Sequence, residues 1–252
     1  MMFQELPFLE RFSAAQRAGF GAVEIQYPYG FTIADLSAAC REVDIPLVLF
    51  NASRGSGKED RGLACLPGRE VEFRNSIEVA LDYSAALGNR FIHVLSGVPT
   101  ASVASEETAS VWQANIKWAA DRTARAGVGI VIEALNHHDV PGYYIASPAH
   151  AVDLIRSLDI EKCGILFDAY HCARSGLPVV ETMLPIMAFI QHIQIADVPM
   201  RTEPGSGHIN WASVFSAIEN SSYTGFVGAE YTPANTTLDG LAWAIPYLEN
   251  SK

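Results

Sequence analysis

Four short apolar runs of the chain each end in a polar side chain that can bind a metal ion or move a proton. These side chains are Glu133, Asp168, Gln194 and Glu230, and they follow one another at intervals of 35, 26 and 36 residues. Three carboxylates in one apolar cavity would each carry a desolvation penalty on the order of several kcal/mol. A divalent cation removes this penalty, and oxygen ligands of this kind suit Mg²⁺ or Mn²⁺, with Co²⁺ as a third candidate. The alternative is that Arg or Lys side chains at the strand ends neutralise the acids.

Further polar residues follow these four closely and are predicted to surround the same site. His171 comes three residues after Asp168, and Arg201 comes seven residues after Gln194. The segment after Glu133 contains Asn136, His137, His138 and Asp139. The alternative for such residues is a solvated loop position, which we favour for His137 and His138. Glu24 is predicted to be an internal ion-pair partner, and His192, two residues before Gln194, a satisfied core histidine, whereas His93 lies near the end of its strand.

The elements that must position these residues alternate regularly between strand and helix. Seven apolar, β-branched runs are typical of strands buried on both faces of a parallel sheet: Ala22–Tyr27, Ile45–Asn51, Arg90–Gly97, Gly129–Asn136, Cys163–Tyr170, Ile190–Asp197 and Gly225–Tyr231. The patterns between and around them are helical: Pro7–Ala18, Ile33–Val43, Glu70–Leu87, Ser105–Ala126, Ser147–Leu158, Val179–Ala188 and Trp211–Glu219. This alternation predicts an α/β fold, and we favour a single (β/α)₈ barrel domain over residues 1–252. Alternation of side chains along each strand would place the four polar residues together at the carboxyl end of the barrel.

The pattern contains seven strands, whereas a closed barrel of this kind has eight. The first helix begins almost at Met1, so the strand that the pattern lacks is the first one. An open sheet edge would expose unpaired backbone groups, and we therefore expect the natural chain to begin before Met1.

Composition and charge restrict the function further. The formal net charge is −11, which disfavours a nucleic-acid partner because phosphate contact normally requires a basic surface. We expect no membrane span, because no run of 18 apolar residues occurs, and no signal peptide, because the first residues carry acids. The protein is thus predicted to be cytoplasmic, with its four cysteines as thiols.

Several segments together resemble the hydroxypyruvate isomerase family of xylose-isomerase-like sugar isomerases and epimerases. They are Cys65-Leu-Pro-Gly-Arg-Glu70, Ile132-Glu-Ala-Leu-Asn-His137, Ile193-Gln-Ile-Ala-Asp197 with the loop to Gly205, and Phe226-Val-Gly-Ala-Glu-Tyr231. The resemblance implies a TIM barrel with one divalent metal ion held by Glu133, Asp168, Gln194 and Glu230. It also implies that Glu133 and Glu230 form the acid–base pair. His171 and Arg201 match positions that contact substrate, and Asp139 matches a substrate-binding acid more loosely.

The activity implied is the interconversion of hydroxypyruvate and tartronate semialdehyde. A glutamate would move a proton between C3 and C2 through an enediolate, with the metal ion as Lewis acid. The partner would be a small hydroxy-keto acid or sugar, and the resemblance is compatible with a homo-oligomer.

Two departures from the family pattern concern the choice of substrate: Phe50 stands where relatives tend to have His, and His208 where they tend to have Glu. The alternatives are a 2-oxotetronate isomerase or a ketose 3-epimerase with the same metal and glutamate pair. A barrel nuclease of the endonuclease IV type is disfavoured, because it would need a His-rich site with several metal ions and a basic surface. The last alternative is a barrel that binds a metal ion without catalysing a reaction.

Overall fold

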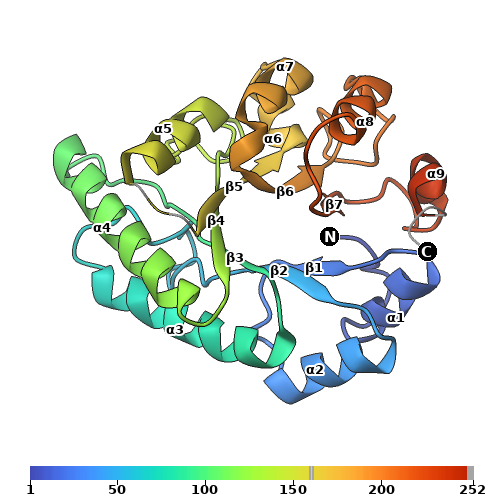
Figure 1. Ribbon diagram of the computed structural model, residues 1–252, viewed down its shortest axis with the longest axis horizontal. Helices are drawn as coiled ribbons and strands as arrows, with labels where there is room; N and C mark the ends of the chain where they lie inside the picture. The colour runs from blue at the N-terminus through green and yellow to red at the C-terminus, as the bar shows by residue number, and fades with distance from the viewer. Residues whose placement is uncertain (159, 161, 249–252) are drawn as a thin grey trace.

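The computed structural model describes residues 1–158, 160 and 162–248. Within these residues one sheet holds seven parallel strands in the order of the sequence. The strands are β1 (Val23–Ile25), β2 (Leu47–Asn51), β3 (Phe91–His93), β4 (Gly129–Glu133), β5 (Cys163–Asp168), β6 (Ile190–Ile195) and β7 (Val227–Ala229). Figure 1 shows the sheet curving around a central axis with the helices outside it, which is a barrel open between β1 and β7.

The helices follow the strands in the predicted alternation. They are α1 (Glu10–Arg17), α2 (Ile33–Glu42), α3 (Glu70–Leu87), α4 (Ser105–Ala124), α5 (Pro148–Leu158), α6 (Ala169–Arg174), α7 (Val179–Met183), α8 (Trp211–Glu219) and α9 (Ile245–Leu248), with 3₁₀ helices η1 (Leu184–Phe189) and η2 (Asp239–Ala244). At the end of α3, Gly88 has a φ of 68°, and after α4, Gly127 has a φ of 77°. Both glycines adopt the left-handed conformation that turns the chain toward the next strand.

The seven strands are all shorter than predicted, and the structure gives a local reason for two of the differences in boundaries. The predicted strand Cys163–Tyr170 ends at Asp168, because the Asp168 carboxylate accepts a hydrogen bond from the Tyr170 N–H and caps α6. The predicted helix Val179–Ala188 divides into α7 and η1, with Pro185 at the start of the 3₁₀ helix.

Two apolar layers hold the barrel. A large cluster lies between the sheet and the helices, and includes Trp112, Phe73 and Ile116. A small cluster of Val48, Leu49, Val131 and Leu166 fills the interior. Val131 and Leu166 stand two residues before Glu133 and Asp168, so both acids belong to the interior-facing series, as the alternation predicted.

Among the described residues, no helix is both long enough and apolar enough to cross a membrane. Cys40, Cys65, Cys163 and Cys172 are free thiols, as predicted.

The opening of the barrel lies between β1 and β7, where the pattern lacked a strand. A cavity of about 730 Å³ occupies this place and is lined by residues of β1 and β7, by Met1–Gln4 and by the C-terminal 3₁₀ and α-helices. The N-terminus lies beside this opening (Figure 1). Over the described residues the sheet is therefore open at the position where the sequence lacked a strand. Through this opening the cavity reaches one side of the barrel's carboxyl end.

Candidate functional site

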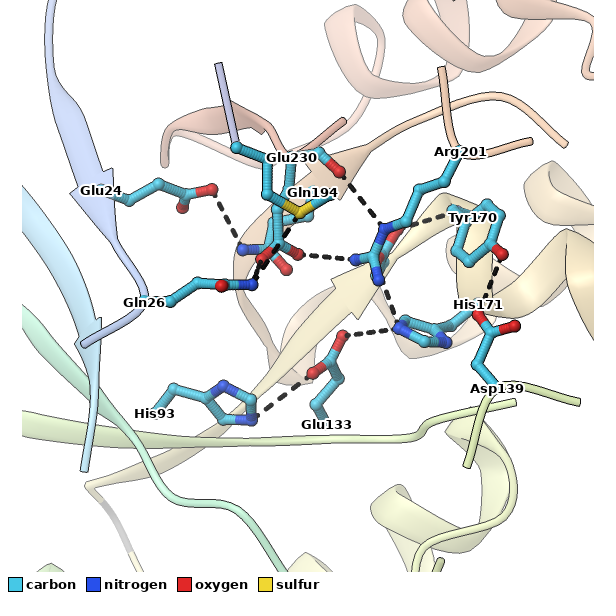
Figure 2. A network of polar contacts seen from close by, with 12 residues as sticks. Glu24, Gln26, His93, Glu133, Asp139, Tyr170, His171, Gln194, Arg201 and Glu230 are labelled. Atoms are coloured by element: carbon cyan, nitrogen blue, oxygen red, sulfur yellow. Dashed lines mark hydrogen bonds and ion pairs between the residues drawn. The ribbon is translucent and has the colours of Figure 1, made fainter. Parts of the chain in front are cut away.

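The carboxyl ends of β4 to β7 bring the four predicted ligands to one end of the barrel. Glu133 and Asp168 are the last residues of β4 and β5, Gln194 is near the end of β6, and Glu230 follows β7 directly. The strand register places Asp168 opposite Gln194. Figure 2 shows Glu133, Gln194 and Glu230 within one network of polar contacts.

The deepest part of this network is a buried group of Glu133, Asp168 and His171. One ligand atom from each of these three residues lies within 4.8 Å of the other two, a spacing that can hold a metal ion. His171 Nε2 is 3.7 Å from Asp168 Oδ2 and 4.0 Å from Glu133 Oε1. The structure therefore joins two predicted metal ligands with a residue predicted to contact substrate.

Burial raises the proton affinity of both acids. Desolvation raises the pKa of Glu133 well above its ordinary value, and the nearby carboxylates of Asp168 and Glu230 raise it further. Desolvation also raises the pKa of Asp168 to about 7, although the Arg201 guanidinium acts in the opposite direction. A carboxyl group whose pKa is raised toward neutrality is suited to act as a general base or acid near pH 7.

His171 is arranged as a hydrogen-bond donor to this pocket. The backbone N–H of Asn136 donates to His171 Nδ1 at 3.1 Å, so the ring proton resides on Nε2, which faces the carboxylates. Desolvation lowers the pKa of His171 to about 3, which keeps the ring neutral. In this tautomer Nε2 donates a hydrogen bond and does not coordinate a cation, which favours a substrate contact.

His93 is arranged in the opposite way and faces Glu133 from β3. Its Nδ1 lies 3.1 Å from Asn51 Oδ1, an acceptor, so Nδ1 carries the proton and Nε2 presents a lone pair. Nε2 is 3.5 Å from Glu133 Oε2, and desolvation lowers the pKa of His93 to about 3. Two acceptors therefore face each other in a buried place.

The polar atoms left without partners fit a cation. In the described part of the chain, Glu133 Oε1 and His93 Nε2 are buried and have no hydrogen-bond partner. An unpartnered buried acceptor is destabilising by about 1–3 kcal/mol, and here the acceptors surround carboxylates whose combined charge one arginine does not balance. The donor set and its unsatisfied atoms thus fit a divalent metal ion beside Glu133.

Arg201 contacts two of the predicted ligands. Its Nη2 is 2.9 Å from Asp168 Oδ2 and 2.7 Å from Glu230 Oε2, and its guanidinium lies 4.8 Å from the centre of the Tyr170 ring. Part of the acidic charge is thus neutralised by an arginine, as the alternative interpretation of the acids required. Within the described residues, the two N–H groups of Nη1 have no hydrogen-bond partner, and they are available to an anionic substrate.

A buried aspartate shapes the loop that carries Arg201. Asp197 accepts hydrogen bonds from the backbone N–H groups of Val198, Gly205, His208 and Ile209 and from the Trp211 indole. Arg201 has a φ of 56°, and its backbone N–H donates to Asp197 O at 3.0 Å. The Asp197 carboxylate therefore holds the turn that sends Arg201 back over the barrel mouth.

Two further polar residues at the site were not predicted to belong to it. Glu24 lies in β1, and Gln26 follows β1 directly. Gln26 Nε2 donates to Glu230 Oε1 at 2.7 Å, and Gln194 Nε2 donates to Glu24 Oε1 at 3.0 Å (Figure 2). Glu24 Oε2 also lies 2.5 Å from His192 Nε2, so Glu24 has an internal polar partner and His192 is the satisfied core histidine that was predicted. The rule used for the other strands, a polar residue at the carboxyl end, would also have identified Gln26.

The segment after Glu133 is divided between the site and the surface. Asn136 is buried beside His171, whereas His137 and His138 are exposed. Asp139 Oδ2 accepts hydrogen bonds from Asn136 Nδ2 and from the Tyr170 hydroxyl, both at 2.9 Å. Asp139 is thus placed next to the residues that hold His171, and a direct substrate contact for it stays a prediction.

The large cavity meets the site from the open side of the barrel. Its lining includes Gln26, Asn51, Gln194 and Glu230. Phe50 is fully buried in the layer between sheet and helices, and His208 is exposed on the loop after β6.

The chain matches known proteins over nearly its whole length. Residues 12–247 match a family model described as "Xylose isomerase-like TIM barrel". The chain is similar to a hydroxypyruvate isomerase of Escherichia coli (38% identity, 98% of this chain and 96% of the relative). It is also similar to a 2-oxo-tetronate isomerase of Cupriavidus necator (37% identity, again 98% and 96%). A solved structure of a protein named as an AP endonuclease of family 2, from Brucella melitensis, superposes with a TM-score of 0.94 at 36% identity, covering 98% of this chain and 95% of that chain.

Proposed function

The chain belongs to the xylose isomerase-like TIM barrel family, and from this premise we propose that it is a metal-assisted isomerase that interconverts hydroxypyruvate and tartronate semialdehyde. The observation that carries the proposal is the buried pair of carboxyl groups, Glu133 and Asp168, with raised pKa values beside unpartnered acceptor atoms. Such a site can hold a cation and move a proton at the same place. We also propose that residues 1–252 act as one domain, which the family match over residues 12–247 supports.

Glu133, Asp168, Gln194 and Glu230 are the residues that would hold the metal ion. Oxygen ligands of this type favour Mg²⁺ or Mn²⁺, with Co²⁺ as a third candidate. When bound, the ion supplies Lewis acidity that stabilises negative charge on the substrate oxygens.

Glu133 and Glu230 are the proposed acid–base pair, and their surroundings differ. Glu133 is buried and its pKa is raised, whereas Glu230 accepts hydrogen bonds from Gln26 and Arg201 on its two carboxylate oxygens. One of these glutamates removes a proton from C3 of the substrate and a proton is returned at C2, while the hydroxyl proton passes from O3 to O2, so that C3 becomes the carbonyl carbon and C2 carries the hydroxyl group. The positions of the two groups at strand ends around one mouth allow each to reach a substrate bound between them.

The remaining polar residues orient the substrate. His171 Nε2–H donates a hydrogen bond to a substrate oxygen, since its Nδ1 is already occupied by the Asn136 N–H. Arg201 binds the substrate carboxylate through Nη1, while Nη2 stays paired with Asp168 and Glu230. Asp139 supports this side of the site through Asn136 and Tyr170.

A 2-oxotetronate isomerase is the second candidate function. The cavity at the barrel opening borders Gln194 and Glu230, and this space suits a substrate with an additional carbon. The 37% identical relative is a 2-oxo-tetronate isomerase. The solved relative from Brucella melitensis is named as an endonuclease, but a net charge of −11 on this chain does not favour binding to a nucleic-acid backbone.

The test is turnover of hydroxypyruvate by metal-stripped protein, with and without added Mg²⁺ or Mn²⁺. We expect metal-dependent formation of tartronate semialdehyde. A parallel assay with 2-oxotetronate distinguishes the two candidates through the ratio of their kcat/KM values. Turnover of neither acid by protein that still binds metal would contradict both assignments.

A further inference from the structure

The carboxylate of Glu24 lies in the barrel interior and is bonded to a proposed metal ligand. Its Oε1 accepts a hydrogen bond from Gln194 Nε2 at 3.0 Å, and its Oε2 lies 2.5 Å from His192 Nε2. Figure 2 shows Glu24 reaching from β1 toward Gln194, outside the group of Glu133 and His171. Glu24 therefore does not reach the proposed cation site itself, but contacts it through the side chain of Gln194.

This contact determines which end of the Gln194 side chain is available. A primary amide has a donor nitrogen at one end and an acceptor oxygen at the other. An ionised Glu24 accepts hydrogen bonds only, so the Gln194 nitrogen is held on the Glu24 side. The oxygen, which is the only amide atom suited to a hard cation, is left for the site.

Two neighbours hold Glu24 in this position. His192 is buried on the same strand as Gln194, and it fixes the second carboxylate oxygen. Gly228 on β7 makes room for the carboxylate, because a Cβ atom there would lie 2.5 Å from Glu24 Oε1. Three strands thus contribute to the orientation of one amide group.

We propose that Glu24 is a positioning residue that orients the Gln194 amide so that its oxygen, and not its nitrogen, is offered to the divalent cation. The inference rests on the proposed function, since it takes Gln194 as a metal ligand. Hydrogen-bond partners that orient a metal ligand typically raise metal affinity by about 10–100-fold.

The experiment measures Mn²⁺ affinity by calorimetry on metal-stripped protein, so it does not depend on turnover. Glu24→Met keeps the length of the side chain and removes both acceptor oxygens, and we expect it to weaken Mn²⁺ binding by about 10–100-fold. Glu24→Gln removes the charge and retains one acceptor oxygen, so its affinity should lie closer to that of the wild type. The matched control is Glu78→Gln, which removes one negative charge from the Glu78–Arg122 pair on the outer helices and should leave the affinity unchanged.

A double-mutant cycle separates orientation from charge. In a Gln194→Ala background there is no amide to orient, so Glu24→Met should change Mn²⁺ affinity by less than about threefold. A loss of the same factor in both backgrounds, or equal losses in Glu24→Met and Glu24→Gln, would mean that Glu24 acts through its charge and would overturn the proposal.

A second variant keeps the proposal testable if Glu24→Met does not fold. Gly228→Ala leaves every charge in place and displaces the Glu24 carboxylate, so it should weaken Mn²⁺ binding only when Gln194 is present. If folded Gly228→Ala and Glu24→Met proteins bind Mn²⁺ with unchanged affinity, the inference about Glu24 is refuted, but the proposed metal site is not. Absence of Mn²⁺ binding by the wild type would instead refute the proposed function on which the inference rests.

Discussion

Replacing Arg201 by Met should destabilise the metal-free protein, and a divalent cation should restore the loss. Arg201 Nη2 bridges Asp168 and Glu230 at 2.9 and 2.7 Å, and the side chains of these two acids are only 1% and 12% exposed. Removal of the guanidinium leaves both carboxylates beside the buried Glu133 without a cation. Their mutual repulsion and desolvation then act without compensation.

The magnitude follows from the burial of the pair. Removal of one partner from a fully buried ion pair is destabilising by roughly 3–5 kcal/mol. Because the Arg201 side chain is 22% exposed, water screens part of the interaction, and we expect a loss of about 2–3 kcal/mol in the free energy of unfolding. For a chain of this size each kcal/mol lowers Tm by about 2–4 °C, so Tm should fall by roughly 4–12 °C.

The assay is thermal unfolding of metal-stripped Arg201→Met with and without saturating Mn²⁺. Bound cation replaces the lost positive charge, so the difference in Tm from the wild type should narrow when Mn²⁺ is present. Arg122→Met is the matched control, because Arg122 pairs with Glu78 on the outer surface, and exposed ion pairs contribute little to stability. A fall in Tm no larger than that of the control, or one that Mn²⁺ does not reduce, would contradict this account of the acidic cluster.

The other predictions concern proton transfer and the Arg201 loop. Glu230→Gln should retain the fold and lose turnover by about 10²–10⁴-fold, the loss expected for a general acid or base; near-normal kcat for hydroxypyruvate would exclude the role. Asp197→Asn should open the 198–209 loop, because an amide nitrogen would face N–H donors of Gly205 or Trp211; limited proteolysis and Trp211 fluorescence would report it. Burial acts to raise the pKa of Asp197, but its hydrogen bonds outweigh burial and lower the pKa below the ordinary value. The Asp197 carboxylate should therefore stabilise the wild-type loop fully above about pH 4, its pKa in the unfolded chain, and this stabilisation should be lost as the pH falls through the lower pKa of the folded protein. Limited proteolysis of the loop between about pH 5 and 2.5 measures the loss, and a cleavage rate independent of pH would contradict the prediction.

Strand ends were predictable from the chain because their signal is local. Apolar runs that end in Glu133, Asp168, Gln194 and Glu230 identify parallel strands, and parallel strands bring their carboxyl ends to one edge. The gap between β1 and β7 was also predictable, because a missing strand leaves the sequence with one apolar run fewer than a closed barrel requires. The cap that ends β5 at Asp168 was not predicted, since the same residue types fit a longer strand until the side chain is seen to accept from the Tyr170 N–H.

Partnerships between distant residues required the folded chain. Gln26 and Glu230 are 204 residues apart, and Glu24 and Gln194 are 170 apart, yet each pair is hydrogen bonded across the barrel. The opposite tautomers of His93 and His171 depend on Asn51 and on the Asn136 N–H, which lie on other elements.

The amino-acid sequence by itself therefore determined the barrel, its seven strands and the end at which its acids gather, because side-chain alternation and strand–helix spacing are properties of neighbouring residues. Only the tertiary structure decided which acid is buried, which is paired with Arg201 and which amide atom Gln194 offers. Burial and hydrogen-bond direction depend on atoms that meet only when the sheet curves around them, and these two properties set the charge and proton affinity of the site.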